Sequence, residues 1–396
     1  MTIRPFAPGD DLALNEVFHD ASTPAGHVVR NLFRAESESP VSRCVVATLD
    51  DSGVGVGSGS GPSDGVSDIL IGAAAIAESP AHPQRAWVNV EVAESERRRG
   101  VGRDLLAAVR ERAAGTALAD LPLRARVEPG SAGEAAARAV GFSPLFTTRV
   151  VEVAPGALGS LGADRLEDFE VTATGSVALT RAFAEWYAGV NRADPAAEMT
   201  IGQVNTRFLS EAAGAHGAAL LRSAVSGDAA GSGSAGSGKA ESGKDREVTT
   251  FAVSYARPET AESQAGTEAW AGQAQAGQSQ AGQSRAASGA AEGAGAGAAF
   301  PAGESDNVGP ATELTLGSMY DAQAGAVGDG AADASDDPAF QAALGDAAVL
   351  LARLSVDTPV ALEVTSEMPV LSTLVDGLLE AGQSRVLQTY VTLGSS

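Results

Sequence analysis

The segment from Val88 to Ala113 holds the residues whose types and spacing point most directly to chemistry. Its centre is a basic turn with two glycines, Arg97-Arg98-Arg99-Gly100-Val101-Gly102-Arg103. Backbone N–H groups in the first turn of a helix have no intrahelical acceptor and carry partial positive charge, so they stabilise an anion. A glycine has no Cβ and lets a ligand approach the backbone closely. The turn therefore predicts a phosphate-binding site.

A strand and a helix must position this turn. Apolar residues at every second place before it are typical of a strand with one buried face: Val88, Val90 and Val92. Asn89 and Glu91 occupy the other face of that strand. After the turn, apolar residues recur at the spacing of an amphipathic helix: Leu105, Leu106, Val109 and Ala113. We therefore expect a strand, a glycine turn and a helix N-terminus in succession.

The motif Arg97-x-x-Gly100-x-Gly102 between this strand and this helix resembles the acetyl-CoA-binding motif of the GNAT superfamily of N-acetyltransferases. The resemblance implies that the backbone of Val90, Glu91 and Val92 pairs with the pantetheine arm. It also implies that the turn residues through Arg103 hold the pyrophosphate, with acetyl-CoA as the acetyl donor and no metal. The alternative is an ordinary strand–turn–helix whose arginines are solvated.

In many members of that family, a glutamate on or near the central strand takes the proton from the amine, often through water. The resemblance makes Glu91 the first candidate for this base and Glu94, just past the strand, the second. For Glu91 the alternative is a solvent-facing strand carboxylate. The family's usual general acid is a tyrosine four residues before the glycine that ends a later helix, and Ala137 stands there before Gly141. Either water serves instead, or a tyrosine of the second half does: Tyr187, Tyr320 or Tyr390.

The surrounding residues complete one domain, which we expect to span residues 1–153. Strands are expected over 2–6, 41–49, 68–76, 121–127 and 147–153, and helices from 10, over 27–35 and over 131–140. The Gly/Ser-rich segment at about 50–67 is read as a flexible insertion. In the family, the segment between the first two helices lines the acceptor site, so three residues are acceptor-side candidates, with solvated or capping roles as the alternative: His19, Asp20 and His27.

The second half, residues 154–396, repeats this order of elements and resembles a second, degenerate GNAT domain. Helices are expected over 172–189, 200–215, 340–354 and 371–380, and strands over 247–256, 311–319, 360–364 and 386–393. Low-complexity insertions are expected at about 226–245 and 258–309. No Arg/Gln-x-x-Gly-x-Gly lies between Met319 and Phe340, so no coenzyme A is expected there.

The expected fold is therefore α/β (α+β), with two GNAT-like domains, each a mixed, mostly antiparallel twisted sheet flanked by helices. The tandem arrangement resembles that of actinobacterial enzymes such as mycothiol synthase. In that enzyme the C-terminal copy is assigned the chemistry, whereas here the motif lies in the N-terminal copy. The substrate of that enzyme is therefore not carried over.

Composition limits the partners. The chain has 50 Asp and Glu against 27 Lys and Arg, a formal net charge of −23, which argues against nucleic acid because such a binder shows a basic face. No segment approaches the roughly 20 apolar residues that span a bilayer, and no signal-peptide pattern is present. We therefore expect a cytoplasmic protein without a membrane partner. Cys44, the single cysteine, excludes an internal disulfide and is read as a core residue and not a nucleophile.

The leading hypothesis is an acetyl-CoA-dependent N-acetyltransferase that acetylates a primary amine by direct attack of the amine on the thioester. The acceptor would be a small-molecule or peptide amine, and the protein a monomer or homodimer. The alternative is a catalytically silent acyl-CoA-binding or regulatory protein that keeps the phosphate turn without the acid. A third hypothesis, a structural tandem without a ligand, requires the arginine–glycine turn to be accidental.

Overall fold

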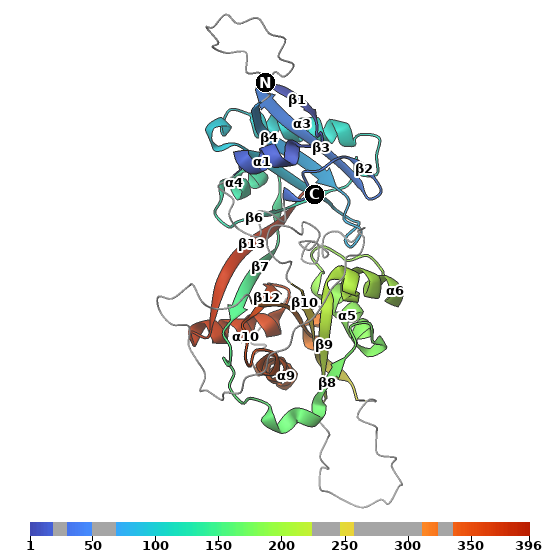
Figure 1. The fold of residues 1–396 in the computed structure, drawn as a ribbon, viewed down its shortest axis with the longest axis vertical. Helices are drawn as coiled ribbons and strands as arrows, with labels where there is room; N and C mark the ends of the chain where they lie inside the picture. Colours follow the sequence, from blue (N-terminus) through green and yellow to red (C-terminus); the bar gives the residue numbers. More distant parts are fainter. Residues whose placement is uncertain (19–29, 50–68, 224–245, 257–310, 324–335) are drawn as a thin grey trace, which may run out of the picture. The chain divides into compact units, whose positions relative to one another are not determined.

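The computed structural model describes residues 1–18, 30–49, 69–223, 246–256, 311–323 and 336–396. The chain forms two compact units (Figure 1). The N-terminal unit comprises Met1–Leu145 and Val391–Ser396, and the C-terminal unit comprises Phe146–Tyr390. The predicted insertions at 50–67, 226–245 and 258–309 lie outside the described residues, as do His19, Asp20 and His27.

The N-terminal unit is built on one mixed sheet. In spatial order its strands are β1 (Thr2–Pro5), β3 (Val41–Leu49), β4 (Ile69–Ala77), β5 (Ala86–Val92), β6 (Leu123–Val127) and the end of β13 (Ser384–Gly394). The first four pair antiparallel, β5 and β6 pair parallel, and Val391–Gly394 pairs antiparallel with β6. A two-residue strand, β2 (Ser37–Glu38), pairs with β3. The expected mixed, mostly antiparallel sheet is confirmed.

Helices flank this sheet: α1 (Asp10–Val17), the 3-10 turn η1 (Glu94–Glu96), α3 (Val101–Ala113) and α4 (Ala132–Ala139). Both α1 and α3 contact β4. Consecutive residues of β3 and β4 are buried, not alternate ones, so both faces of the central sheet are covered. Cys44 lies 1% exposed in β3, and burial raises the pKa of its thiol to about 12, which confirms it as a core residue.

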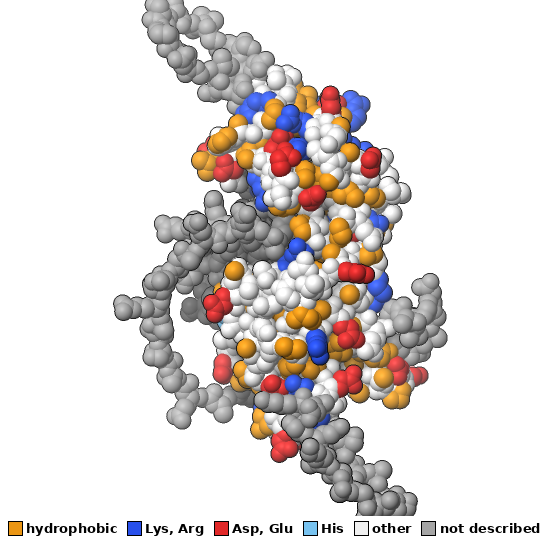
Figure 2. Space-filling model, turned by 90° about the vertical axis from the view of Figure 1, so that its right-hand side faces the viewer, with side chains coloured by type: hydrophobic (Ala, Val, Ile, Leu, Met, Phe, Trp, Pro, Cys, Tyr) orange, Lys and Arg blue, Asp and Glu red, His pale blue; other side chains and the backbone are white. Residues whose placement is uncertain are grey.

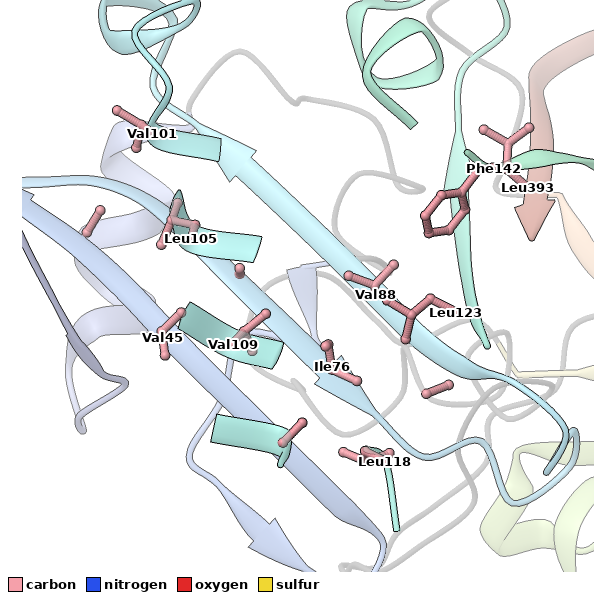
Figure 3. Close-up of a cluster of buried hydrophobic side chains, with 14 of the residues drawn as sticks. Val45, Ile76, Val88, Val101, Leu105, Val109, Leu118, Leu123, Phe142 and Leu393 are labelled. Carbon is pink, nitrogen blue, oxygen red and sulfur yellow. The ribbon is translucent and has the colours of Figure 1, made fainter. Parts of the chain in front are cut away.

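The core below α3 fixes the orientation of β5. Leu105, Val109 and Ala113 of α3 are buried, as the helical spacing predicts, and Val101 joins them (Figure 3). Leu106, also predicted, is partly buried and packs against the same core. Each buried valine or leucine side chain contributes about 1.5–3 kcal/mol by leaving water. On β5, Val88 belongs to this core, and Val90 and Val92 pack against it. The predicted alternation is thereby confirmed, and Glu91 points to the opposite face of the sheet.

The C-terminal unit repeats the sheet order. Its strands, in spatial order, are β8 (Phe169–Thr172), β9 (Ala215–Arg222), β10 (Val248–Tyr255), β11 (Thr312–Ser318), β12 (Val360–Thr365) and β7 (Ser143–Val153), with Ser384–Tyr390 of β13 next to β7. The first four pair antiparallel, β11 and β12 pair parallel, and β12 pairs antiparallel with β7. Its main helices are α5 (Val177–Val190), α8 (Met319–Gln323), α9 (Pro338–Leu354) and α10 (Pro369–Glu380). The predicted internal repeat is confirmed by this pairing pattern.

Two predicted helices begin or end elsewhere. Around 27–35, only Arg30 of the described residues is helical, and the chain turns immediately after it. Leu32 and Phe33 are adjacent in sequence and both buried. Neighbouring residues of a helix point in different directions, so a turn buries both side chains more readily than a helix does. In the second half, β8 occupies residues 169–172, and α5 begins only at Val177 because the Ser176 side chain accepts the N–H of Leu179.

The helix predicted over 200–215 is broken. A capping box between Thr200 and Gln203 starts α6 (Ile201–Val204), which continues as a π-helix over Asn205–Leu209 and a 3-10 turn over Glu211–Ala213. Gly214 then adopts φ 84° and directs the chain into β9. The residues predicted to form the apolar face of this helix, Val204, Phe208 and Leu209, are buried.

Candidate functional site

The strands β5 and β6 begin as a parallel pair and then part. Their ladder consists of Ala86↔Leu123 and Trp87↔Arg124, whereas β5 continues to Val92 and β6 to Val127. The backbone of the last five residues of β5 therefore runs beyond the ladder with β6. An extended ligand chain aligned with this part of β5 can exchange strand-like hydrogen bonds with it.

The chain leaves β5 through a tightly folded turn. The Nε–H of Arg97 donates to the carbonyl oxygen of Val92 at 3.0 Å, and Arg99 pairs with Glu96 at 2.9 Å. Arg98 has φ 67°, the only such non-glycine residue in the described part of the chain. A left-handed conformation costs an L-residue about 1–2 kcal/mol, so the turn holds Arg98 in a strained state. Strain of this kind is common at ligand sites.

Helix α3 starts at this turn with Gly100 as its N-cap, at φ 90° and without a side-chain cap. The first helical bond runs from Asp104 N–H to Gly100 O at 3.1 Å. The N–H groups of Val101, Gly102 and Arg103 consequently have no intrahelical acceptor. Arg99 and Arg103 lie beside them with 66% and 83% of their side chains exposed, so both guanidinium groups can reach an anion from solvent.

Packing does not require glycine at position 102. A Cβ there would lie 3.5 Å from Val92 Cγ2 and 3.7 Å from Val90 Cγ1, which is ordinary van der Waals contact. Glycine costs a helix up to about 1 kcal/mol relative to alanine. The fold alone would therefore favour alanine, and a glycine that keeps the helix N-terminus bare needs a different explanation. Close approach of a ligand to the backbone is such an explanation.

Glu91 makes an ion pair on the opposite face of β5. Its Oε2 accepts the Nε–H of Arg30 at 2.9 Å, with side-chain exposures of 24% for Glu91 and 10% for Arg30. The Arg30 guanidinium lies 5.0 Å from the ring centroid of Phe18, the last described residue before position 30. Glu91 is thus a partly buried, oriented carboxylate. Glu94 is exposed at the start of η1, on the solvent side of the turn.

The positions considered for a general acid have other surroundings. Ala137 lies in α4 and packs against the N-terminal core. Tyr187 stacks on Phe183 at 5.9 Å in an aromatic cluster of the C-terminal unit. The hydroxyl of Tyr320 donates to Asp337 at 2.7 Å, and that hydrogen bond raises the pKa of the phenol. Tyr390 is buried. The described part of the N-terminal unit contains no tyrosine.

In the C-terminal unit, the strand of the parallel pair that corresponds to β5 is followed by a different structure from the basic turn. After the β11–β12 ladder ends at Leu314↔Leu362, the short helix α8 follows β11 directly. Asp321 of α8 is fully buried, and its Oδ1 accepts the N–H of Val370 at 2.8 Å. Burial raises the pKa of Asp321 to about 7, although hydrogen bonds from Val370 and Leu371 and the nearby Arg192 act in the opposite direction. This buried acid stands after the strand that corresponds to β5, where the N-terminal unit has its basic turn.

Other kinds of site in the described residues would be marked by a large charged patch, a metal-binding group or a membrane-spanning helix. On the face shown in Figure 2, basic and acidic side chains are interspersed instead of gathered into one large patch. Within the described ranges, no group of three or more His, Cys, Asp or Glu is placed to hold a metal ion. None of the described helices is long and apolar enough to cross a bilayer.

No protein-family model matches the chain, and no curated protein matches it significantly in sequence. Among solved structures, the chain is similar to a GCN5-related N-acetyltransferase from Sphaerobacter thermophilus, with 12% identity, TM-score 0.49, and coverage of 100% of this chain and 95% of that chain. It is also similar to a tandem GNAT protein from the clavulanic acid biosynthesis pathway, with 14% identity, TM-score 0.45, and coverage of 100% and 98%. Arabidopsis thaliana NAA60, in complex with a bisubstrate analogue, matches with 16% identity, TM-score 0.27, and coverage of 37% and 86%.

Proposed function

We propose that the N-terminal unit is an acetyl-CoA-dependent N-acetyltransferase that acetylates a primary amine. One observation carries the proposal: Gly102 stands at the bare N-terminus of α3 although the fold leaves room for a larger residue. The parting of β5 from β6 and the arginines of the turn support it, because they suit an extended chain that ends in a pyrophosphate.

Each part of the donor then has a matching part of the protein. The N–H groups of Val101, Gly102 and Arg103 would hold the pyrophosphate, with Arg97, Arg98, Arg99 and Arg103 around it. The pantetheine arm would lie along the backbone of Val90, Glu91 and Val92. The thioester would then lie near the point where β5 and β6 part, on the side to which Glu91 is directed.

The reaction is a direct transfer. The ammonium of the acceptor loses a proton to the Glu91 carboxylate, directly or through a water, and the resulting amine attacks the thioester carbonyl carbon. A C–N bond forms and the C–S bond breaks. The nitrogen gives up its second proton to water, and water protonates the coenzyme A thiolate, so the only net proton released is the one that Glu91 accepts. Water fits this last role because Ala137 stands at the position considered for a tyrosine. Holding both reactants in line supplies a large part of the rate enhancement.

A silent acyl-CoA-binding protein is the second candidate. The ion pair between Glu91 and Arg30 favours it, because a carboxylate already bonded to a guanidinium must turn or share that bond to accept a proton. The two functions differ in turnover. Coenzyme A release is to be measured with acetyl-CoA and a panel of amino acids, diamines, arylalkylamines and peptides with free N-termini.

Release that depends on an amine, and that falls at least a hundredfold in Glu91→Gln, supports the transferase. Acetyl-CoA binding without release for any amine in the panel supports the silent protein. Absence of acetyl-CoA binding contradicts both.

A further inference from the structure

The sheet face that carries Glu91 is rich in arginine. On β6, Leu123 belongs to the core, and Ala125 and Val127 pack against it, so Arg124 and Arg126 point to the face opposite α3. The same holds for Trp87 on β5, whose neighbours Ala86 and Val88 are core residues. Contacts confirm this, since the guanidinium carbons of Arg124 and Arg126 lie 3.9 and 5.9 Å from the Trp87 ring centroid.

The ladder register gives the spacing of these residues. Trp87 is level with Arg124 at the last rung of the ladder, and beyond this rung Arg126 lies two residues along β6 and Glu91 four residues along β5. With a rise of about 3.3 Å per residue, the levels of Arg126 and Glu91 differ by roughly 7 Å along the strands. The strands also part beyond the last rung, so a ligand that contacts both side chains needs two functional groups several ångströms apart.

Arg124 and Arg126 have different surroundings. Arg124 is 2% exposed, lies against Trp87 and donates to the hydroxyl of Ser79, so its surroundings are those of a structural residue. Arg126 lies further from the ring and is only partly buried. It makes further interactions within the protein, but a guanidinium has five N–H donors and serves more than one acceptor. Its planar fork matches the two oxygens of a carboxylate.

The charges on this face of β5 and β6 favour an acceptor with a carboxylate over one with a second ammonium. The chain has a net charge of −23, yet Glu91 is the only acid among the side chains on this face of β5 and β6: Trp87, Asn89, Glu91, Arg124 and Arg126. Arg30 brings one more cation to Glu91. A second ammonium, as in a diamine, would meet repulsion from these guanidinium groups, whereas a carboxylate would be attracted.

We propose that the amine acceptor carries a carboxylate several ångströms from its amine, and that Arg126 binds this carboxylate while Glu91 faces the amine. The acceptor is thus an amino acid or a related amino carboxylate. This proposal rests on the proposed N-acetyltransferase function and adds a substrate class to it. Arg126 acts as a specificity-determining residue.

Matched amines test this proposal. The probes are lysine against cadaverine, 6-aminohexanoate against pentylamine, and 4-aminobutyrate against propylamine, each pair differing by one carboxylate. Coenzyme A release and calorimetric binding to the protein saturated with coenzyme A are to be measured. In wild type, at least one carboxylate probe is expected to bind and react about tenfold or more better than its partner, since a hydrogen bond to a charged group contributes this much. The preference is expected to vanish in Arg126→Gln and to survive in Arg138→Gln, an exposed position on α4.

The outcomes separate this proposal from the proposed function. Equal use of both members of every pair by wild type overturns the carboxylate proposal and leaves the transferase intact. A preference that persists in Arg126→Gln also overturns it. If acetyl-CoA binds but no probe releases coenzyme A, the transferase fails, and calorimetry still decides the carboxylate site. Binding of a carboxylate probe that Arg126→Gln abolishes supports the site, and absence of binding in wild type refutes it.

Discussion

The Nε of Arg30 lies 2.9 Å from Oε2 of Glu91, across 61 residues of sequence and on the sheet face opposite α3. This ion pair orients the carboxylate on the part of β5 that lies beyond the ladder with β6. It also sets the main question for the mechanism, because the same carboxylate is the candidate base. Both side chains are largely shielded from water, so their interaction is stronger than that of a typical surface pair.

Glu91→Gln is expected to lower kcat by about 10²–10⁴, because it removes the proton acceptor. The dissociation constant of acetyl-CoA should change little, since the side chain points away from the α3 core. Glu94→Gln is the matched comparison, and it should retain near wild-type kcat because Glu94 lies exposed at the start of η1. A larger loss in Glu94→Gln than in Glu91→Gln would transfer the role of base to Glu94.

A double-mutant cycle measures how much the ion pair between Arg30 and Glu91 contributes to stability. Arg30→Gln, Glu91→Gln and the double variant are expected to show a coupling of about 1–2 kcal/mol in the free energy of unfolding, as for a hydrogen bond between charged groups. Chemical denaturation of the four proteins gives this value. Additive effects of the two substitutions would show that the pair has no energetic role in solution.

Gly102→Ala should separate stability from binding. The substitution is expected to raise the free energy of unfolding by about 0.4–1 kcal/mol, because it reduces the entropy of the unfolded chain and meets only ordinary contacts. Acetyl-CoA binding should weaken about tenfold or more, since the new methyl group takes up space between α3 and the Val90 and Val92 side chains, beside the proposed pyrophosphate site.

Gly133→Ala is the control for Gly102→Ala. Gly133 is the second residue of α4, as Gly102 is of α3, and a Cβ there also meets contacts of 3.5 Å or more. It should stabilise the protein similarly without an effect on acetyl-CoA binding. Equal loss of binding in both variants would contradict a ligand role for Gly102.

Asp321 makes stability depend on pH in a defined window. Burial raises its pKa from 3.8 to about 7 in the folded protein, so between these values the folded state retains a proton that the unfolded state has lost. Its contribution is fully present below pH 3.8, declines as pH rises toward about 7, and is constant above that. Asp321→Asn should remove this slope and raise the unfolding free energy at pH 8 by up to about 4 kcal/mol. Thermal unfolding of both proteins from pH 4 to 8 measures the difference, and parallel pH profiles would contradict the assignment.

Cys44 is expected to resist thiol reagents in the native protein. It is 1% exposed, and burial raises its pKa to about 12, so the reactive thiolate is scarce at neutral pH. Modification by 5,5′-dithiobis(2-nitrobenzoate) at pH 8 should follow unfolding, with rapid reaction only in denaturant. Rapid stoichiometric reaction of the native protein would show that the β3–β4 core opens readily.

The sequence predicted the local framework of the site well. The alternating valines of β5 and the helical spacing from Leu105 to Ala113 are confirmed. An element with one buried face has apolar residues at the period of that element, so the pattern is visible in the sequence. The turn between them is marked by Gly100, whose φ of 90° disfavours any residue with a side chain.

Long-range partners were not predictable in this way. The pairing of Arg30 with Glu91 cannot be predicted from the sequence pattern, since an ion pair between distant segments leaves no periodic signal. The pairing of Val391–Gly394 with β6 was also missed, because a strand pattern gives the faces of a strand and not its neighbours. The arginines on β6 were assigned to a strand, but their contact with Trp87 depends on the register of two strands.

Calorimetric titration of acetyl-CoA into wild type, Gly100→Glu and Gly115→Glu tests whether the turn before α3 binds the coenzyme. Gly100 and Gly115 have similar φ angles of 90° and 78°, and a Cβ at either meets no close contact, so the two substitutions impose comparable backbone strain. Only the first places bulk and negative charge at the N-terminus of α3. Binding is expected in wild type and in Gly115→Glu, and none in Gly100→Glu. Absence of binding in wild type, or undiminished binding in Gly100→Glu, would contradict this expectation.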